Sequence, residues 1–285
     1  MKNLITVLLS LTFVNFSYTA TQKSWTPKYK SARLKKLKTK IKPTKKHNDK
    51  LQSNVAKSKI IPSNDLEKLY LKKAKSKDSI KELKAVTLMW KQKAVPTLTK
   101  VMKSKNYPEE NRWVATFMLG RIMGVKSAEY ISKFTKHPNW MLRLASLKVL
   151  LHLKQKKYEG IYSRMLEDDS MIIRHQALQN IRDLKLKKLA PYVWKMLYNK
   201  SNYVGKSGSR KRASIIKDAI KTVGELEFNK AKKPLLTMMQ KNKYKDVFEE
   251  LDYSLSKITK KISPSGSLQA KQFFWRRIAL KEMTI

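Results

Sequence analysis

The sequence lacks cysteine and contains little glycine or proline. Among its 285 residues there are no cysteines, seven glycines and nine prolines. Without cysteine the chain has no disulfide and no thiolate for catalysis, metal ligation or lipid attachment. The scarcity of glycine and proline favours helices over a β-sandwich or barrel, because those folds need many tight turns. These absences predict an all-α protein without thiol chemistry.

Acidic residues are also scarce. The chain has 21 Asp and Glu against 64 Lys and Arg, which gives a formal net charge of +43. Such an excess attracts anionic partners, namely nucleic acid, acidic lipid or acidic polysaccharide. Lysine outnumbers arginine by 53 to 11, however, and arginine is the residue favoured for bidentate phosphate recognition. The charge is therefore consistent both with an anionic partner and with a lysine-rich composition that serves no ligand.

The only candidate targeting segment is a short apolar run at the N-terminus. Lys2 precedes an apolar stretch over residues 4–16, and small residues follow as far as Ala20. The run is too short to span a membrane comfortably, so residues 1–20 are predicted to be a cleaved signal peptide. Tyr18 is a poor match to the cleavage pattern, which leaves an uncleaved anchor as the alternative. We expect an exported protein, either periplasmic or secreted.

Residues 21–63 form a strongly basic segment. They include 14 basic residues, one acid (Asp49) and three prolines, without apolar periodicity. This composition predicts a disordered basic linker, because the segment has too little apolar surface to form a core. It is either a polycationic arm that contacts an anionic surface or a solvated spacer.

A repeated pattern occupies residues 64–260. Arg112, Arg143 and Arg174 are 31 residues apart, and an apolar residue follows each after seven positions. The same frame continues at Ile216, after a longer spacing of 42, and at Phe248. Second apolar stripes recur about 19 residues after the frame position, at Tyr162, Val193 and Leu235. Polar turns separate these stripes, and Asn64 is placed to cap the first helix. A fixed period of this length predicts an array of stacked helix pairs.

Residues 112–122 (RWVATFMLGRI) have the layout Arg-x-x-Ala-x-x-x-Leu-Gly-x-Ile and resemble HEAT-like repeats of the short, phycobilisome-lyase type. Residues 174–184 and 219–226 match parts of the same layout, and the resemblance covers residues 78–260. It implies a right-handed α-solenoid of stacked antiparallel helix pairs. It also implies protein–protein scaffolding, with nucleic-acid binding in some members. The frame arginine is replaced by Ile216 and Phe248, which departs from the pattern.

The three frame arginines have two interpretations. Bonding to acids or to helix-end carbonyls in the preceding turn would join neighbouring repeats. A row of ligand-binding arginines is the alternative. Similarly, Trp113 and Trp140 lie near the starts of first helices and Trp194 lies on a second helix. They are expected in the core, whereas stacking on bases or sugars is the functional alternative.

Basic residues cluster in the turns within successive repeats and in the 11-residue insertion between Arg174 and Ile216. The insertion contains a Gly-Lys-Ser triplet at Gly205, but Lys200 stands where a P-loop requires glycine, so nucleotide hydrolysis is excluded. If the repeats stack, the turns align into a basic stripe; a solvated turn surface is the alternative. The candidate contacts to an anionic partner are Lys154, Lys156, Lys157, Lys185, Lys187, Lys188, Lys206, Arg210, Lys211, Arg212, Lys230, Lys232 and Lys233.

Residues 261–285 form a C-terminal tail in which 268–282 are predicted to be an amphipathic helix. We expect this helix to cover the open end of the core. The alternative is contact with an anionic membrane or a partner. The residues that would make that contact are Phe273, Phe274, Trp275, Arg276 and Arg277.

No catalytic, cofactor or metal-binding pattern is present. The four histidines do not have ligand spacing, and the acids have no paired His or Ser. We therefore expect a non-enzymatic scaffold that binds a protein or an acidic polymer through its surface and lysine-rich turns. The alternatives are a nucleic-acid-binding HEAT-like protein and a peripheral membrane adaptor.

Overall fold

The computed structural model describes residues 64–74, 76–203 and 214–283, and within these ranges it contains helices and turns but no strand. The predicted all-α class is therefore confirmed for this part of the chain. All described residues belong to one unit, Lys59–Ile285. The predicted signal peptide (1–20) and basic linker (21–63) lie outside the described residues.

The α-helices follow one another with short connections. They are α1 (Asp65–Leu71), α2 (Lys77–Trp90), α3 (Val95–Lys103), α4 (Glu109–Met123), α5 (Ala128–Lys133), α6 (Trp140–His152), α7 (Glu159–Met165), α8 (Met171–Asp183), α9 (Ala190–Lys195), α10 (Ser214–Glu225), α11 (Lys232–Met239), α12 (Phe248–Thr259) and α13 (Leu268–Met283). Turns of 3-10 helix extend several of them, namely η2 (Lys91–Ala94), η3 (Gly124–Ser127), η4 (Phe134–Lys136), η5 (Lys156–Tyr158), η6 (Lys187–Leu189), η7 (Met196–Tyr198), η8 (Lys200–Asn202), η9 (Asn229–Ala231) and η10 (Asn242–Val247).

Polar side chains begin several of these helices, as the sequence predicted. The Asn64 side chain accepts a hydrogen bond from the backbone N–H of Glu67, which caps α1. Asn139 does the same for the N–H of Met141 at the start of α6. These bonds satisfy N–H groups that have no partner inside the helix. The positions of the turns therefore follow from local sequence.

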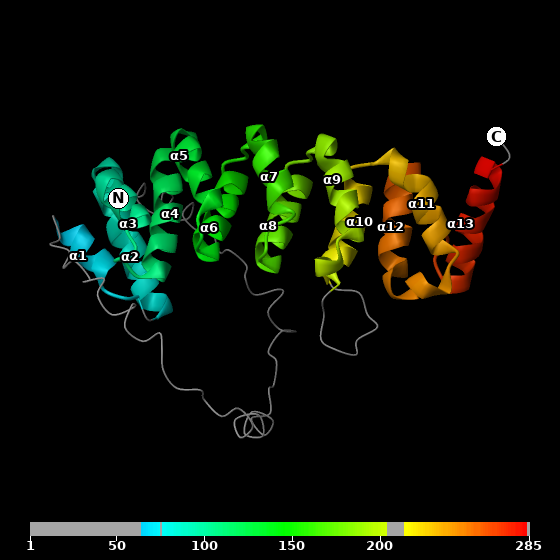
Figure 1. The fold of residues 1–285 in the computed structure, drawn as a ribbon, viewed down its shortest axis with the longest axis horizontal. Helices are drawn as coiled ribbons and strands as arrows, with labels where there is room; N and C mark the ends of the chain where they lie inside the picture. Colours follow the sequence, from blue (N-terminus) through cyan, green and yellow to red (C-terminus); the bar gives the residue numbers. More distant parts are fainter. Residues whose placement is uncertain (1–63, 75, 204–213, 284–285) are drawn as a thin grey trace, which may run out of the picture. The chain divides into compact units, whose positions relative to one another are not determined.

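Long and short helices alternate along the chain. The even-numbered helices from α2 to α12 have 12 to 15 residues, whereas the odd-numbered helices from α3 to α11 have six to nine. Each long helix from α4 on packs against the long helix before it and against the short helix that precedes it in the chain. Figure 1 shows the helices in this chain order. The packing thus repeats with the period of the sequence.

The core is a band of apolar side chains between these helices. Leu119, Leu150 and Ile181, which occupy the same position of the 31-residue frame, are completely buried. Helix α6 is apolar on most of its surface and contributes to two core clusters. Leu142 and Val149 belong to one cluster, and the other contains Leu144, Leu147 and Leu150. A helix with so little polar surface is stable only when it is covered on several sides.

One turn geometry recurs after α6, α8 and α10. Lys154, Lys185 and Glu227 adopt positive φ angles of 52°, 54° and 54°. After α8, the N–H of Lys185 donates to the Arg182 carbonyl and the N–H of Leu186 donates to the Ile181 carbonyl, both at 3.0 Å. This pair of bonds is a Schellman motif, in which glycine usually takes the left-handed position. Here that position carries charged side chains.

Two glycines allow long helices to approach closely. Gly120 in α4 and Gly224 in α10 both lie eight residues after the frame position. A Cβ atom on Gly224 would lie 2.6 Å from the Cα of Ser254 in α12. A Cβ on Gly120 would lie 2.5 Å from Cγ1 of Val149 in α6. The glycine of the repeated layout is therefore used for packing between consecutive long helices.

The frame arginines bond to helix-end carbonyls in the preceding turns, as expected. Arg112 donates to the Met102 carbonyl at 2.9 Å, Arg143 to the carbonyl of His137 at 2.9 Å, and Arg174 to that of Asp168 at 2.7 Å. Of the two alternatives, acids or carbonyls, the carbonyls of the preceding turn are therefore the common partner. The Asp168 carboxylate, which lies in the turn before Arg174, binds Arg143 of the preceding frame unit.

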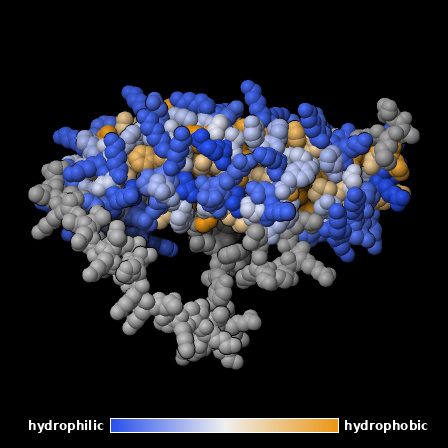
Figure 2. Space-filling view, viewed as in Figure 1, coloured by the Kyte–Doolittle hydropathy of each residue, from blue (hydrophilic) through white to orange (hydrophobic). Residues whose placement is uncertain are grey.

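The tryptophans differ from one another in their burial. Trp113 and Trp194 are partly buried and pack against the two core clusters. The prediction of a core position is wrong for Trp140, which is 43% exposed. Trp140 is the first residue of α6, so its side chain lies at the end of the helix. Figure 2 shows a largely hydrophilic face with smaller hydrophobic areas between the polar side chains.

Candidate functional site: two binding surfaces

The first candidate surface is the lysine edge, which we define as nine lysines in the turns after α6, α8 and α10 and at the start of α11. Eight of them are exposed, and Lys232 is partly buried. The members of the lysine edge are Lys154, Lys156, Lys157, Lys185, Lys187, Lys188, Lys230, Lys232 and Lys233. The residues of the first two turns have matching places: Lys154 and Lys185 follow a long helix with positive φ, and the next lysines lie in η5 and η6. The repeated turn therefore presents the same charges twice.

The third turn of the edge differs from the first two because it contains an acid. Glu227 occupies the left-handed position that Lys154 and Lys185 occupy in the earlier turns. Its carboxylate is 2.6 Å from the Lys187 ammonium and also binds Lys260. Hydrogen bonds from these two lysines lower the pKa of Glu227 to about 2. A uniformly positive stripe is therefore not present, and Lys187 is partly neutralised.

Four of the predicted basic contacts are not placed. Lys206, Arg210, Lys211 and Arg212 belong to the insertion over residues 204–213, which lies outside the described residues. Helix α10 begins immediately after it, at Ser214.

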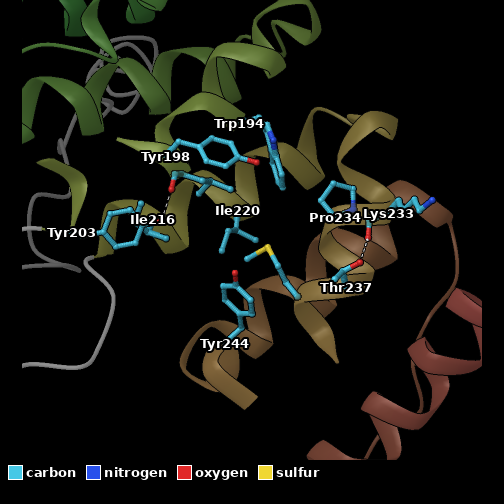
Figure 3. Close-up of a pocket in the computed structure, with 11 residues that line it drawn as sticks. Trp194, Tyr198, Tyr203, Ile216, Ile220, Lys233, Pro234, Thr237 and Tyr244 are labelled. Carbon is cyan, nitrogen blue, oxygen red and sulfur yellow. Dashed lines mark hydrogen bonds between the residues drawn. The ribbon is translucent and has the colours of Figure 1, made fainter. Parts of the chain in front are cut away.

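The second candidate surface is the aromatic groove between α9 and α11. Its cavity volume is about 410 Å³. It is lined by Trp194, Leu197, Tyr198, Tyr203, Ile216, Ile220, Lys233, Pro234, Thr237, Met238 and Tyr244. Figure 3 shows the rings of Trp194 and Tyr198 on one side of Ile220 and the ring of Tyr244 on the other. Tyr198 is 70% exposed, so much of this aromatic surface faces solvent.

Sequence reasoning did not identify the aromatic groove. The longer spacing of 42 residues pointed to this part of the chain, but the prediction there concerned only the basic insertion. Trp194 and Tyr198 are one helical turn apart, which alone resembles a core stripe. Tyr244 lies about fifty residues farther along the chain, so no local pattern connects it with them.

The C-terminal helix α13 is attached through a buried polar cluster. The indole N–H of Trp275 donates to Asp252 at 2.7 Å, the Ser263 hydroxyl donates to the same oxygen at 2.7 Å, and Lys271 binds the other oxygen at 2.8 Å. Burial raises the pKa of the Asp252 carboxyl, but the hydrogen bonds from Lys271, Ser263 and Trp275 together outweigh it and lower the pKa below its ordinary value.

This attachment bears on the two interpretations of the tail. Trp275 is completely buried in a core cluster and Phe274 packs against it, as a helix that covers the end of the core requires. The alternative, in which Trp275 contacts a membrane or a partner, is wrong for this residue. The reason is that its indole N–H and its ring are both used to dock α13. Phe273, Arg276 and Arg277 remain exposed.

The described residues contain no group of three His, Asp or Glu side chains that would hold a metal ion. In this part of the chain no helix is both long enough and apolar enough to cross a membrane. No protein-family model matches the chain, and no curated protein matches it.

Proposed function

We propose that this protein is an exported, non-enzymatic binding protein built as a right-handed HEAT-like α-solenoid. The repeated packing between long helices supports the solenoid, because each long helix from α4 on packs against the long helix before it, as stacked repeats do. The recurring Schellman turns and the close approach at Gly120 and Gly224 support the HEAT-like assignment. The task proposed for this scaffold is to bind an acidic protein or another acidic polymer.

The repeated lysine turn is the observation that carries this function. Lys156 and Lys157 in η5 are matched by Lys187 and Lys188 in η6, and all four are exposed. Packed helices are about 8–10 Å apart, so consecutive turns present charge at a regular interval. A row of exposed ammonium groups attracts a polyanion over a distance set by the ionic strength.

Charge reversal tests the lysine edge. The change is Lys156→Glu with Lys188→Glu, and the probes are fluorescein-labelled poly-glutamate and heparin. We expect about tenfold weaker binding at low salt. The salt dependence should also become shallower, by about one unit of slope for each ion pair with the polyanion that the change removes, as for phosphate groups. The matched control is Lys105→Glu with Lys136→Glu, which makes the same charge change at exposed lysines outside the edge.

Equal losses in the two variants would show that only net charge matters and would refute the edge as a site. Absence of binding by the wild-type protein at low salt would refute the electrostatic proposal as a whole. A preference for single- or double-stranded DNA over poly-glutamate, with full-length protein in the cytosol, would favour the nucleic-acid alternative. Export itself predicts a mature chain shorter by about 20 residues in the periplasm or medium.

The exposed side of α13 supports one second candidate, a peripheral membrane adaptor. Phe273 is 65% exposed and Leu280 is 52% exposed, and Arg276 and Arg277 are exposed on the same helix. Co-sedimentation with vesicles of anionic phospholipid tests this candidate. Phe273→Ser should abolish it while leaving the buried Trp275 cluster intact; unchanged co-sedimentation would exclude this face.

A further inference from the structure

The aromatic groove departs from the chemistry of the neighbouring gap between short helices. In the gap between α7 and α9, Glu167 and Lys195 form an ion pair of 3.0 Å. The positions that correspond to them one unit later, counted from Val193 and Leu235, are Tyr198 and Thr237, and both line the groove. The ion pair between the turn after α7 and the end of α9 therefore has no counterpart in the groove, where a tyrosine and a threonine take the corresponding places. Stacking of the helices does not require this replacement.

The interior of the groove is apolar even where its residues are polar. Ile216 and Ile220 at its base are 1% and 0% exposed. The Tyr203 hydroxyl donates to the Leu197 carbonyl at 2.6 Å, and the Thr237 hydroxyl donates to the Lys233 carbonyl at 3.1 Å. These two hydroxyls are bonded within the protein, and the base formed by the two isoleucines favours contact with an apolar group. Tyrosine and tryptophan are also the residues most often found at energetically dominant interface positions.

The charge around the groove is positive. Its lining contains Lys233 and no carboxylate. In Figure 3 the Lys233 side chain extends from the rim away from Ile220, toward the outside. The Lys243 ammonium lies 5.0 Å from the centre of the Tyr244 ring, which forms part of the wall. An occupant that fits this arrangement has an apolar centre and negative charges beside it.

We infer that the aromatic groove is the docking site for an acidic segment of a partner protein, which inserts one or two apolar side chains against Trp194, Tyr198 and Tyr244. The volume of about 410 Å³ lies within the range of pockets that hold small ligands. This inference rests on the proposed binding function for the acidity of the partner. The groove supplies the anchor, and the lysine edge supplies long-range attraction.

The test uses the mature protein and a fluorescein-labelled peptide with two tryptophans flanked by glutamates. Two further peptides replace the tryptophans by serine or the glutamates by lysine, and binding is measured by fluorescence anisotropy at physiological salt. We expect the tryptophan–glutamate peptide to bind at least about tenfold more tightly than either of the others, as expected for anchored interface side chains.

Variants then assign the binding to the groove. Tyr198→Ala removes one wall, and Tyr198→Glu with Thr237→Lys recreates the ion pair of the neighbouring gap without changing the net charge. Each change should weaken binding of the tryptophan–glutamate peptide at least about tenfold. The matched control is Tyr192→Ala, which removes an exposed tyrosine of α9 that lines the neighbouring cavity beside Glu167 and Lys195 but does not line the groove. Thermal unfolding confirms that all three variants are folded.

Several outcomes would overturn the inference. If the serine peptide binds as tightly as the tryptophan–glutamate peptide, apolar side chains do not anchor the partner. If the lysine peptide binds as tightly, the partner need not be acidic. A loss of binding in Tyr192→Ala as large as in Tyr198→Ala would show that the peptide does not bind specifically in the groove. Binding that appears only after residues 204–213 are replaced by a glycine–serine linker would assign the groove to the chain's own insertion.

The same measurements separate the groove from the lysine edge. If the edge proposal fails and the groove proposal holds, Lys156→Glu with Lys188→Glu leaves poly-glutamate binding unchanged, whereas the groove variants still weaken the tryptophan peptide. If the groove proposal alone fails, poly-glutamate binding responds to the edge variant and the tryptophan and serine peptides bind equally.

Discussion

The contact between Arg143 and Asp168 makes a quantitative prediction about how neighbouring units are joined. The Arg143 guanidinium donates two bonds of 2.8 Å to the Asp168 carboxylate and two of 2.9 Å to the carbonyls of His137 and Pro138. The side chains of Arg143 and Asp168 are only 14% and 7% exposed. This pair connects α6 with the turn before α8, where Asp168 also accepts the N–H of Ser170 at 2.9 Å.

The perturbation is Arg143→Met, which keeps most of the apolar length and removes all four bonds. Hydrogen bonds to charged groups contribute about 1.5–3 kcal/mol, and removing one partner of a buried pair costs about 3–5 kcal/mol. Because this pair is partly exposed, we expect a loss of about 3 kcal/mol in the free energy of unfolding. Asp168→Asn keeps the acceptor for Ser170 and should cost about 1.5 kcal/mol. The coupling in the double variant should be about 1–2 kcal/mol.

The assay is urea unfolding followed by circular dichroism, with hydrogen exchange to locate the loss in α6 and α8. A matched control is Arg182→Met, because Arg182 and Asp183 form a contact of 3.3 Å in which both side chains are more than a third exposed. That exposed pair should contribute less than about 1 kcal/mol. Equal losses for Arg143→Met and Arg182→Met, or a coupling below about 0.5 kcal/mol, would refute the reasoning.

Three further predictions concern the turns, the packing and the C-terminal helix. Lys185→Gly should raise the free energy of unfolding by about 0.5–1 kcal/mol, because glycine adopts positive φ without the strain of a side chain. Gly224→Ala should lower it by about 1–3 kcal/mol, because the new Cβ meets the backbone of Ser254; both changes are measured by urea unfolding. The ionised Asp252 carboxylate should stabilise the docked α13 fully above the ordinary pKa of 3.8. This stabilisation should be lost as the pH falls through the lower pKa of the folded state, and hydrogen-exchange protection of α13 should be lost with it.

Each of these has a clear contrary result. A destabilised Lys185→Gly protein would mean that the lysine side chain itself holds the turn. An unchanged Gly224→Ala protein would mean that α10 and α12 separate without cost. Asp252→Asn should make the hydrogen-exchange protection of α13 independent of pH. If that protection is independent of pH in the wild-type protein as well, the Asp252 carboxylate is not the group that docks α13.

The helical class, the period and the turns could be predicted from the sequence because they depend on local signals. Buried positions such as Leu119, Leu150 and Ile181 repeat at fixed offsets, and polar residues such as Asn64 and Asn139 cap the helices that follow them. A 3.6-residue periodicity and a capping side chain act within one or two turns of helix, so the amino-acid sequence specifies them directly.

Contacts between units could not be predicted in the same way. The sequence left open whether acids or carbonyls of the preceding turn bind the frame arginines. Asp168 lies in the turn before Arg174, yet its carboxylate binds Arg143, because that turn also follows the unit of Arg143. Trp275 has the sequence context of an amphipathic surface helix, but Asp252 and the core remove it from solvent. The partner of the Asp168 carboxylate and the burial of Trp275 both depend on which helix lies next to them in the folded protein.

The sequence by itself therefore determined an all-helical, lysine-rich repeat protein and the places where its turns occur. Only the tertiary structure decided which surfaces those elements form. It places Glu227 within the lysine edge, where it pairs with Lys187, and it brings Trp194, Tyr198 and Tyr244 around one groove. The physical reason is that helix formation depends on neighbours along the chain, whereas a binding surface depends on side chains that meet only after the helices have packed.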